Sequence, residues 1–403
     1  MTRVLFLAES FHPVLGGGET HLRQLAAALV TLGMPATVMT RRSEAAWPPE
    51  ETQEGVRIVR LPPSGPARTG KYAMAPRALR ALLREPFDVL VVRGTRVLGL
   101  PGLLAARWLR RPVVLQCEVS GEMSGEIYTW GTRYDVGALR RAVRVGAWLR
   151  NRLLADADAF VTISRATQGE FLAAGLDADR VRHIPHGVDT RRFRPASEQE
   201  RHDLRGRLGL DPDARLSVFT GRLLRGKGLE VLVDAFGRLA SELTAARLLL
   251  VGSGRGQALD VEDALRAQVK GLGLAKRVGF TGRVENVEDW LRAADAFVFP
   301  SFFEAMPLSV IEAAACGLPC VASAVGGIPD VVEDGASGWL VRPGDRVGLA
   351  GALRFALLDP AAARLRGAAA RRTVEDHFDF DRNAERYRTL FVELAAQAAG
   401  RAA

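Results

Sequence analysis

The chain has 403 residues, of which 48% are hydrophobic and 25% are charged, and its formal net charge is +9. This length exceeds what one hydrophobic core usually supports, so we expect two domains of ordinary globular composition. A basic surface attracts phosphate-bearing partners, but the charge alone does not separate nucleic acid from anionic lipid or a nucleotide. The three cysteines form no paired framework and match no zinc spacing, which excludes a disulfide scaffold.

The first apolar run, Val4 to Ala8, is interpreted as a buried strand, because it is too short for a signal-peptide core and Glu9 follows at once. No later stretch reaches the uncharged length that a membrane-spanning helix needs, so we expect a protein of the cytoplasm or of a membrane surface. Alternation of strand-like and helix-length segments then predicts an α/β domain with a parallel sheet covered on both faces. The further strand-like runs begin at Ala36, Val56, Asp88, Pro112, Ala159 and Val181.

A polar stretch rich in proline and glycine, Pro185 to Glu200, interrupts this alternation and is predicted to be a hinge. Two doubly wound domains place the carboxyl ends of their strands across a cleft from each other, so a ligand between domains is expected. The helical stretch from Asp381 to Ala395 carries one apolar stripe, formed by Tyr387, Leu390, Phe391 and Leu394. The second series of strand-like runs begins at Leu216, Arg247, Arg277, Ala296, Pro319 and Ser337.

Two carboxylates, Glu304 and Glu312, interrupt the otherwise apolar stretch SFFEAMPLSVIEAAACG. Pro307 is suited to the start of a helix, so Glu304 is predicted in the preceding loop and Glu312 within the helix. Free backbone N–H groups at Leu308 and Ser309 would offer a phosphate site at the helix N-terminus, and Glu312 could accept hydrogen bonds from ribose hydroxyls. The alternative is that Glu304 only favours the helix dipole and Glu312 faces solvent.

Two cations lie in the glycine-rich turn TGRLLRGKG, where Arg222 and Lys227 could hold a diphosphate. Solvated charges on a surface turn are the alternative, and the spacing does not match a Walker motif. The segment HPVLGGGETH follows the first strand, so Gly16 and Gly17 would let the backbone approach a phosphate closely.

Together these segments resemble the retaining glycosyltransferases of the GT-B fold, in particular glycosyltransferase family 4. The similarity spans nearly the whole chain, and the glutamates eight residues apart with their flanks are its most specific part. The resemblance implies an N-terminal Rossmann-like acceptor domain (1–190), a nucleotide-sugar-binding domain (191–377), and a C-terminal helix (378–403) that packs back on the N-terminal domain. The segments that carry it are GGGE at Gly16, ISRAT at Ile163, PHGVD at Pro185, GRLLRGKG at Gly221, LLLVGSG at Leu248, FTGRV at Phe280, EAMPLSVIE at Glu304 and GGIPDVVEDGASGWLV at Gly326.

The same resemblance implies a role for each matching residue. Arg222 and Lys227 would hold the diphosphate of a UDP- or GDP-sugar, Glu312 the ribose, and Glu304 the donor sugar. The backbone at Val284 would contact the base. Gly16 and Gly17 would close over the phosphates from the other domain. Because family members react on one face of the sugar, the main catalytic task is to stabilise the departing nucleoside diphosphate, which cations and a helix N-terminus perform. No metal, no other cofactor and no nucleic acid are then expected.

Two departures from the family pattern affect the predicted contacts. Many relatives carry a histidine in a loop of the first domain, whereas LQCEVSGEMSGE has none; Glu118, Ser120 and Glu122 are the polar candidates there for contacts with the sugar or acceptor. Pro307 lacks the N–H that relatives offer before the helix, so the backbone at Met306 and Leu308 must supply the contact. A nucleotide-sugar epimerase of the same fold, or a catalytically silent nucleotide-sugar-binding protein, stays open as an alternative.

The segment 138–154 places arginines beside leucine, valine and tryptophan side chains. Basic amphipathic helices of this kind lie at anionic membrane surfaces, although an arginine-rich helix packed on the sheet has the same pattern. The resemblance suggests a hydroxyl acceptor on a lipid carrier or a growing bacterial polysaccharide, lipopolysaccharide or glycolipid, consistent with the inner face of the cytoplasmic membrane. The oligomeric state is left open.

Overall fold

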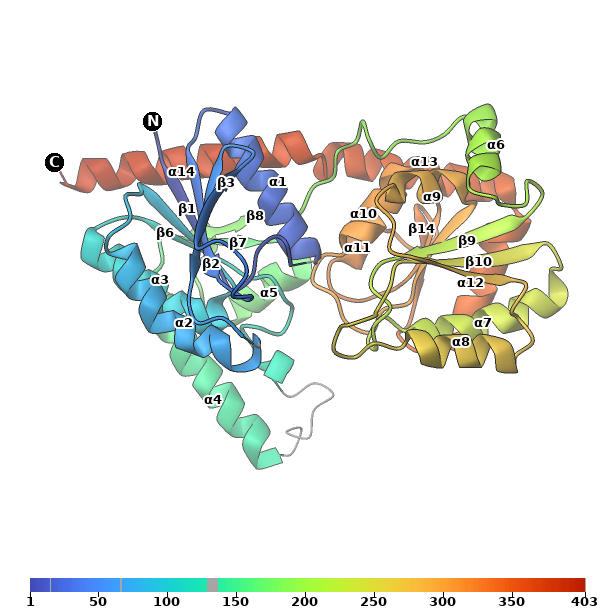
Figure 1. Cartoon of the computed structure of the whole chain (residues 1–403), viewed down its shortest axis with the longest axis horizontal. Coiled ribbons are helices and arrows are strands. Elements are labelled where there is room, and N and C mark those ends of the chain that lie inside the picture. Colours follow the sequence, from blue (N-terminus) through green and yellow to red (C-terminus); the bar gives the residue numbers. More distant parts are fainter. Residues whose placement is uncertain (15, 66, 129–136, 403) are drawn as a thin grey trace. The chain divides into compact units, whose positions relative to one another are not determined.

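The apolar runs form two separate sheets, each in its own structural unit (Figure 1). The computed structural model describes residues 1–14, 16–65, 67–128 and 137–402. Unit 1 comprises Met1–His186 with Asp381–Ala403, and unit 2 comprises Gly187–Phe380. Each unit has the doubly wound α/β organisation that the alternation of strands and helices predicts.

The sheet of unit 1 has the strand order β3-β4-β2-β1-β5-β6-β7-β8. Its pairs are parallel except β3 with β4, an antiparallel edge pair that the apolar pattern did not predict because β3 reads EETQ. The helices and strands are β1 (Val4–Ala8), α1 (Gly17–Thr31), β2 (Ala36–Arg41), β3 (Glu50–Gln53), β4 (Val56–Leu61), α2 (Ala67–Leu82), β5 (Val89–Arg93), α3 (Thr95–Leu109), β6 (Val113–Gln116), the 3-10 helix η1 (Glu126–Tyr128), α4 (Gly137–Leu154), β7 (Ala159–Thr162), α5 (Arg165–Ala173), η2 (Ala178–Arg180) and β8 (Val181–His183).

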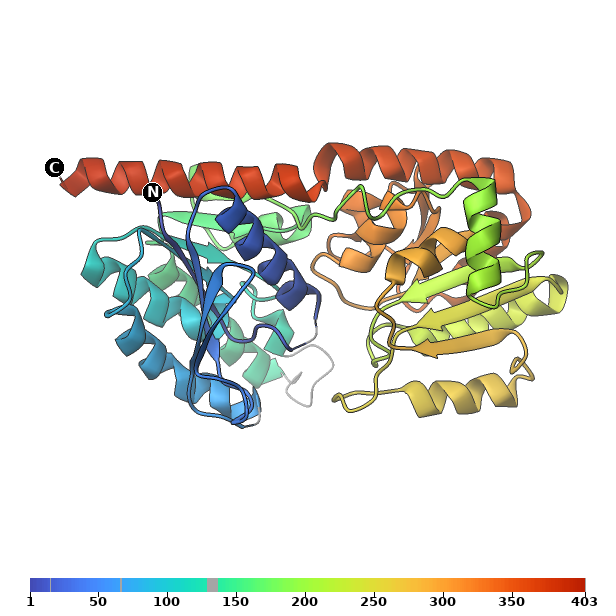
Figure 2. The same ribbon diagram turned by 45° about the horizontal axis from the view of Figure 1, so that its top comes forward.

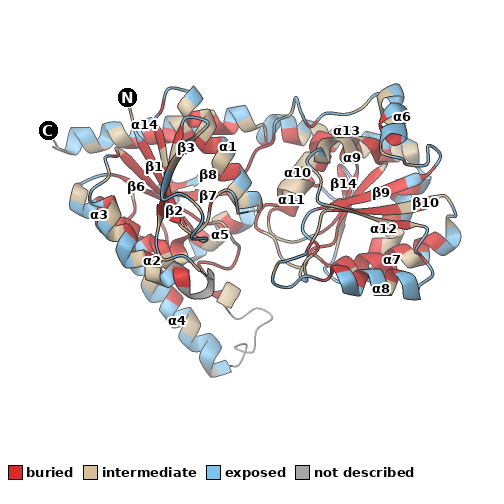
Figure 3. Ribbon diagram, viewed as in Figure 1, coloured by how far each residue is buried: buried red, intermediate tan, exposed pale blue. Residues whose placement is uncertain are grey.

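Both faces of this sheet are buried, and β1 shows why its sequence is continuously apolar. Successive side chains of a strand point to opposite faces, so Phe6 joins one hydrophobic cluster while Leu5 and Leu7 join the other. Figure 3 shows the strands buried and the outer sides of the helices exposed.

The last helix, α14 (Phe380–Ala402), completes the first of these clusters. Its predicted apolar stripe packs on the sheet, with the ring of Phe391 set edge-on to Phe6 at a centroid distance of 6.1 Å. Tyr387 is fully buried there, with its hydroxyl 3.4 Å from the Oε1 atom of Gln116. Figures 1 and 2 both show α14 lying along this sheet.

Unit 2 has a parallel sheet in the order β11-β10-β9-β12-β13-β14. The chain runs outward from β9 to β11 on one side and from β12 to β14 on the other, so its order reverses between the two central strands. The elements are α6 (Glu198–Arg207), β9 (Arg215–Thr220), α7 (Leu229–Glu242), β10 (Ala246–Val251), α8 (Glu262–Gly271), β11 (Val278–Gly282), α9 (Val287–Ala293), β12 (Ala296–Phe299), α10 (Leu308–Ala315), β13 (Cys320–Ser323), α11 (Ile328–Val331), β14 (Gly338–Val341), α12 (Arg346–Leu358) and α13 (Pro360–His377).

The unit boundaries fall a few residues from the predicted positions 190 and 377. The N–H of Val188 donates to the carbonyl of Phe378 at 2.9 Å, and the N–H of Phe380 donates back to Val188 at 3.0 Å. These two hydrogen bonds hold the start and the end of unit 2 together. Within the described part of the chain, no helix combines the length and the apolar character that crossing a bilayer requires.

Candidate functional site

The reversal of strand order in unit 2 marks the edge of the sheet where ligands bind in doubly wound folds. The loop after β9 carries Arg222 and Lys227, and the loop after β12 carries Glu304. Because β9 and β12 are neighbours in the sheet, their carboxyl ends bring both loops to one place. As predicted, Glu304 precedes helix α10 and Glu312 lies within it, with Pro307 immediately before the first helical residue.

Lys227 and Glu304 form an ion pair at the centre of this edge. The Nζ atom of Lys227 lies 2.5 Å from the Oε1 atom of Glu304, and the hydroxyl of Ser301 donates to the same oxygen at 2.7 Å. The ammonium also lies 5.2 Å from the centroid of the Phe299 ring. The side chains of Lys227 and Glu304 are 22% and 11% exposed, so neither is fully buried.

Two glycines allow the loops to approach this closely. Gly228 has φ 69°, and a Cβ atom there would overlap the carbonyl oxygen of Pro300. Gly326 has φ 54°, and its Cβ would overlap the carbonyl oxygen of Glu304. In both cases the left-handed backbone and the lack of space require glycine. The loops are also joined directly, because the N–H of Phe302 donates to the carbonyl of Gly226 at 2.9 Å.

Arg222 lies in the same loop as Lys227 but is exposed, and its guanidinium donates to Gln257 at 3.3 Å. Val284 follows β11 at the same edge of the sheet. Met306 is buried, whereas Leu308 and Ser309 in the first turn of α10 are partly exposed. The predicted ligand contacts of these residues stay predictions.

Glu312 lies in an environment that disfavours its negative charge. Burial raises the pKa of its carboxyl to about 7, while Arg192 lowers it and Glu288 raises it. Arg192 is itself engaged with Glu288 at 2.8 Å, so it compensates Glu312 only in part. A half-buried carboxylate without a full counter-charge is a common feature of a ligand site.

We expect Glu312→Gln to make the ligand-free protein more stable at pH 8. The pKa of Glu312 is about 7 in the folded protein against an ordinary value of 4.5, so the folded state holds this proton more tightly than the unfolded chain. The free energy of unfolding therefore falls as the pH rises between these values, by about 3 kcal/mol in total. Glutamine has no such proton. Urea unfolding should show the full gain in stability of Glu312→Gln at pH 8, and a gain of less than about 1 kcal/mol at pH 5.

The matched control, Glu230→Gln, should show no gain in stability at either pH. A wild-type protein as stable as Glu312→Gln at pH 8 would contradict the raised pKa of Glu312.

The candidates in unit 1 lie around the corresponding reversal between β1 and β5. Gly16 is the N-cap of α1 and Gly17 its first residue. Glu118 receives two hydrogen bonds from the buried Arg93, at 2.7 and 2.8 Å, and Arg93 also donates to the carbonyl of Gly18 at 3.3 Å. Glu118 therefore stands beside the start of α1, with its carboxylate partly exposed.

The other two acceptor-side candidates are buried. Ser120 is 8% exposed and Glu122 is fully buried. The Oε1 atom of Glu122 accepts from the backbone N–H groups of Thr95 and Arg96 at 2.5 and 2.9 Å, which places a carboxylate at the N-terminus of α3. Burial raises the pKa of Glu122. In this conformation the Oε1 atom of Glu122 caps helix α3, a role that the sequence did not predict, and its expected contact with the sugar or acceptor stays a prediction.

Three residues that shape the unit 2 site, Ser301, Arg192 and Glu288, were not predicted from the sequence. Ser301, which donates to Glu304, follows a predicted strand directly, and this position at the end of a strand is a usable signal. Arg192 lies in the stretch interpreted as a hinge, and Glu288 lies on α9, so neither could be assigned to Glu312 before the fold was known.

Comparisons with known protein families and with curated proteins both find glycosyltransferases. The family described as "Glycosyltransferase Family 4" matches residues 15–192, and the family described as "Glycosyl transferases group 1" matches residues 214–359. The chain is 32% identical over 363 residues to D-inositol 3-phosphate glycosyltransferase 1 of Catenulispora acidiphila, which covers 86% of this chain and 83% of that protein.

Solved structures also match over nearly the full chain. Sucrose-phosphate synthase of Thermosynechococcus elongatus superimposes with a TM-score of 0.83 at 26% identity, covering 98% of this chain and 100% of the other. Anabaena HepE in complex with UDP-glucose gives a TM-score of 0.73 at 21% identity, with 99% of each chain covered. At that identity the second match shows the fold alone.

Proposed function

The chain belongs to glycosyltransferase family 4, and from this we propose that it is a retaining enzyme that moves a sugar from a UDP- or GDP-sugar to a hydroxyl acceptor. The observation that carries this proposal is the Lys227–Glu304 pair, built with Ser301 at the ligand-binding edge of the unit 2 sheet. A cation that is only partly buried and borders a carboxylate is suited to exchange that partner for a phosphate oxygen.

Each group has a distinct role in the proposed reaction. Lys227 and the exposed Arg222 neutralise the diphosphate as its bond to the anomeric carbon breaks, and the N–H groups of the first turn of α10 add to this field. Glu304, released from Lys227, accepts hydrogen bonds from the donor sugar. Glu312 binds the ribose hydroxyls. Donor and acceptor react on one face of the sugar, so the anomeric configuration is kept, and no metal takes part.

A panel of UDP- and GDP-sugars tests the proposal through two readouts. With a simple alcohol as acceptor, we expect release of the nucleoside diphosphate from one class of donor, and the NMR coupling of the anomeric proton in the stable glycoside product should report the configuration of the donor. Release from no member of the panel would count against the activity, whereas an inverted product would count against retention alone.

We further propose that the acceptor is a bacterial polysaccharide, lipopolysaccharide or glycolipid reached at the inner face of the cytoplasmic membrane, through α4. Trp148, Leu149 and Leu153 of this helix are each more than half exposed. Its arginines at positions 140, 141, 144 and 152 are exposed as well, and the Arg152 guanidinium lies 5.8 Å from the centroid of the Trp148 ring. Exposed apolar side chains interleaved with cations support an anionic lipid surface.

Sedimentation with anionic vesicles checks this contact. Each arginine near the surface contributes about 1 kcal/mol, so replacing Arg140, Arg141 and Arg144 by alanine should lower the partition coefficient by about two orders of magnitude. Trp148→Ala should weaken partition as well. Phe355→Ala, which removes an equally exposed aromatic side chain from α12, is the matched control and should have no effect. Equal sedimentation of the triple variant and the wild type would rule out this helix as the contact.

A further inference from the structure

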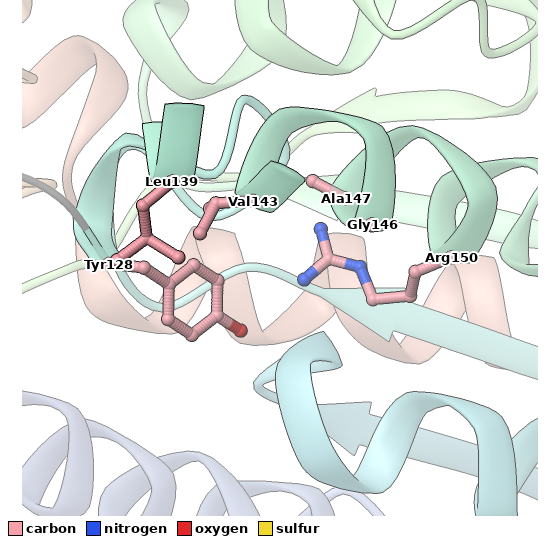
Figure 4. A pocket seen from close by; sticks show the side chains of 6 residues that line it. All are labelled: Tyr128, Leu139, Val143, Gly146, Ala147 and Arg150. Atoms are coloured by element: carbon pink, nitrogen blue, oxygen red, sulfur yellow. The ribbon is translucent and has the colours of Figure 1, made fainter. Parts of the chain in front are cut away.

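A pocket of about 440 Å³ lies in unit 1 between η1 and α4 (Figure 4). It belongs to none of the predicted donor contacts. In the close-up, the Tyr128 ring faces the side chains of Leu139 and Val143, and its hydroxyl lies on the side of the Arg150 guanidinium. Among the residues that the structure describes, the pocket is lined by Tyr128, Leu139, Val143, Gly146, Ala147 and Arg150.

Beside the pocket, the segment before η1 is tied to α4 by hydrogen bonds and packs closely against it. Arg150 donates to the carbonyl of Glu122 at 2.6 Å, and Asn151 donates to the carbonyl of Met123 at 2.8 Å, so the segment before η1 is fixed to the last turns of α4. Gly125 has φ 82°, and a Cβ there would press on Val143 and Ala147. At Gly146, by contrast, an added Cβ would meet nothing within 4 Å.

The described lining of the pocket has an apolar part and a polar part. Leucine, valine, glycine and alanine form an apolar wall, while the Tyr128 hydroxyl and the Arg150 guanidinium supply the polar groups. Burial raises the pKa of the Tyr128 hydroxyl, so it stays a neutral hydrogen-bond donor. The volume lies in the range of about 300–1,000 Å³ that holds small-molecule ligands.

The outer side of α4 carries both apolar and positively charged side chains next to the pocket. Leu149 follows Gly146 by three residues and Leu153 follows Arg150 by three, so exposed leucines continue the apolar wall to the surface. Exposed arginines of the outer side flank it. The positive charge around the opening favours an anionic ligand over a neutral one, and a hydrocarbon chain that ends in an anionic group satisfies the wall, the polar end and the surrounding charge together.

We propose that this pocket binds the hydrocarbon chain of an anionic amphiphile, whose charged group is held near Tyr128 and Arg150. If the proposed transferase function holds, on which this step rests, that amphiphile is the acceptor class, and the pocket selects an acceptor by its chain. Filling the pocket should then remove acceptor binding without changing the donor site.

Calorimetric titration of the full chain tests the pocket with dodecanoyl lysophosphatidic acid, used as a monomer below its micelle concentration. Gly146→Leu places a side chain in the open space, and it favours the helix because leucine is the better helix former. We expect it to weaken binding by about tenfold or more, since several methylene contacts are lost. Gly169→Leu, at an equally open and exposed position of α5, is the matched control and should bind as the wild type does.

Two further ligands separate the contribution of the hydrocarbon chain to binding from that of the negative charge. Glycerol 3-phosphate, which has the headgroup without the chain, should not bind, and dodecanoyl lysophosphatidylcholine, which has the chain without net negative charge, should bind more weakly. Equal affinity of the wild type and Gly146→Leu for the lysophosphatidic acid would overturn the proposal, as would equal affinity for the two lipids. A dimer that Gly146→Leu dissociates in analytical ultracentrifugation would also overturn it, because a second copy would then be the occupant.

The experiments distinguish failure of the amphiphile site from failure of the proposed transferase function. Gly146→Leu should keep the wild-type affinity for UDP or GDP, because the predicted donor contacts do not include the lining of the pocket. If Gly146→Leu binds dodecanoyl lysophosphatidic acid as the wild type does while sugar transfer is intact, only the amphiphile site is rejected. Conversely, absence of any turnover of nucleotide sugars would reject the transferase and leave the lipid titration as an independent result.

Discussion

Replacement of Lys227 by alanine is expected to lower kcat/KM for the donor by about two to three orders of magnitude. This is the cost of removing one preorganised group that faces developing negative charge. The Lys227 ammonium is held by Glu304 at 2.5 Å in the ligand-free protein, so its position is set before the diphosphate arrives. Initial-rate measurements with the donor found in the panel give the ratio directly.

Arg225→Ala is the matched control for this prediction. Arg225 lies in the same loop, two residues before Lys227, and its side chain is exposed. If the loop contributed only general positive charge, both variants would lose activity to a similar extent. We expect Arg225→Ala to stay within about threefold of the wild type, because surface charges away from the reacting groups are screened. Similar losses in the two variants would contradict a specific role for Lys227.

Glu304→Gln is expected to lower kcat by about two orders of magnitude while leaving the protein folded. The substitution keeps the size of the side chain and an oxygen that can accept from the Ser301 hydroxyl, but it removes the charge that orders Lys227. Since both partners remain partly exposed, the free energy of unfolding should fall by no more than about 1–3 kcal/mol. Circular dichroism melts and initial rates, measured on one preparation, separate the two effects.

The double variant of Lys227→Ala with Glu304→Gln distinguishes a shared function from two separate ones. Groups that act on one bound molecule lose activity in a strongly non-additive way. We therefore expect the double variant to be little worse than Lys227→Ala alone. Fully multiplied losses would mean that Lys227 and Glu304 act on the bound donor independently of each other.

The fold followed from the sequence because continuous apolar runs such as Val4–Ala8 are diagnostic of strands buried on both faces. The polar strand β3 could not be found this way, since its side chains alternate between exposed and half-exposed and carry no apolar period. The apolar stripe of α14 was readable, but its position against Phe6 depended on tertiary packing.

For the candidate site, the sequence located the loops but not the contacts within them. Lys227 and Glu304 could be placed together because each follows a strand of one parallel sheet, and such strands end at one edge. Arg192 and Glu122 could not be interpreted from local pattern. The first acts on Glu312 through the tertiary fold, and the second caps a helix that begins 27 residues earlier in the chain. The pocket beside α4 likewise depends on the approach of Gly125 to Val143.

The most direct test of the central claim compares nucleoside diphosphates with monophosphates by titration calorimetry of the full chain. If Lys227 and its neighbours hold a diphosphate, UDP or GDP should bind about ten to a hundred times more tightly than UMP or GMP, because charge-assisted hydrogen bonds to the second phosphate contribute about 1.5–3 kcal/mol. Most of that difference should disappear in Lys227→Ala. Equal affinities for the mono- and diphosphate in the wild type, or a difference that survives in Lys227→Ala, would contradict the account.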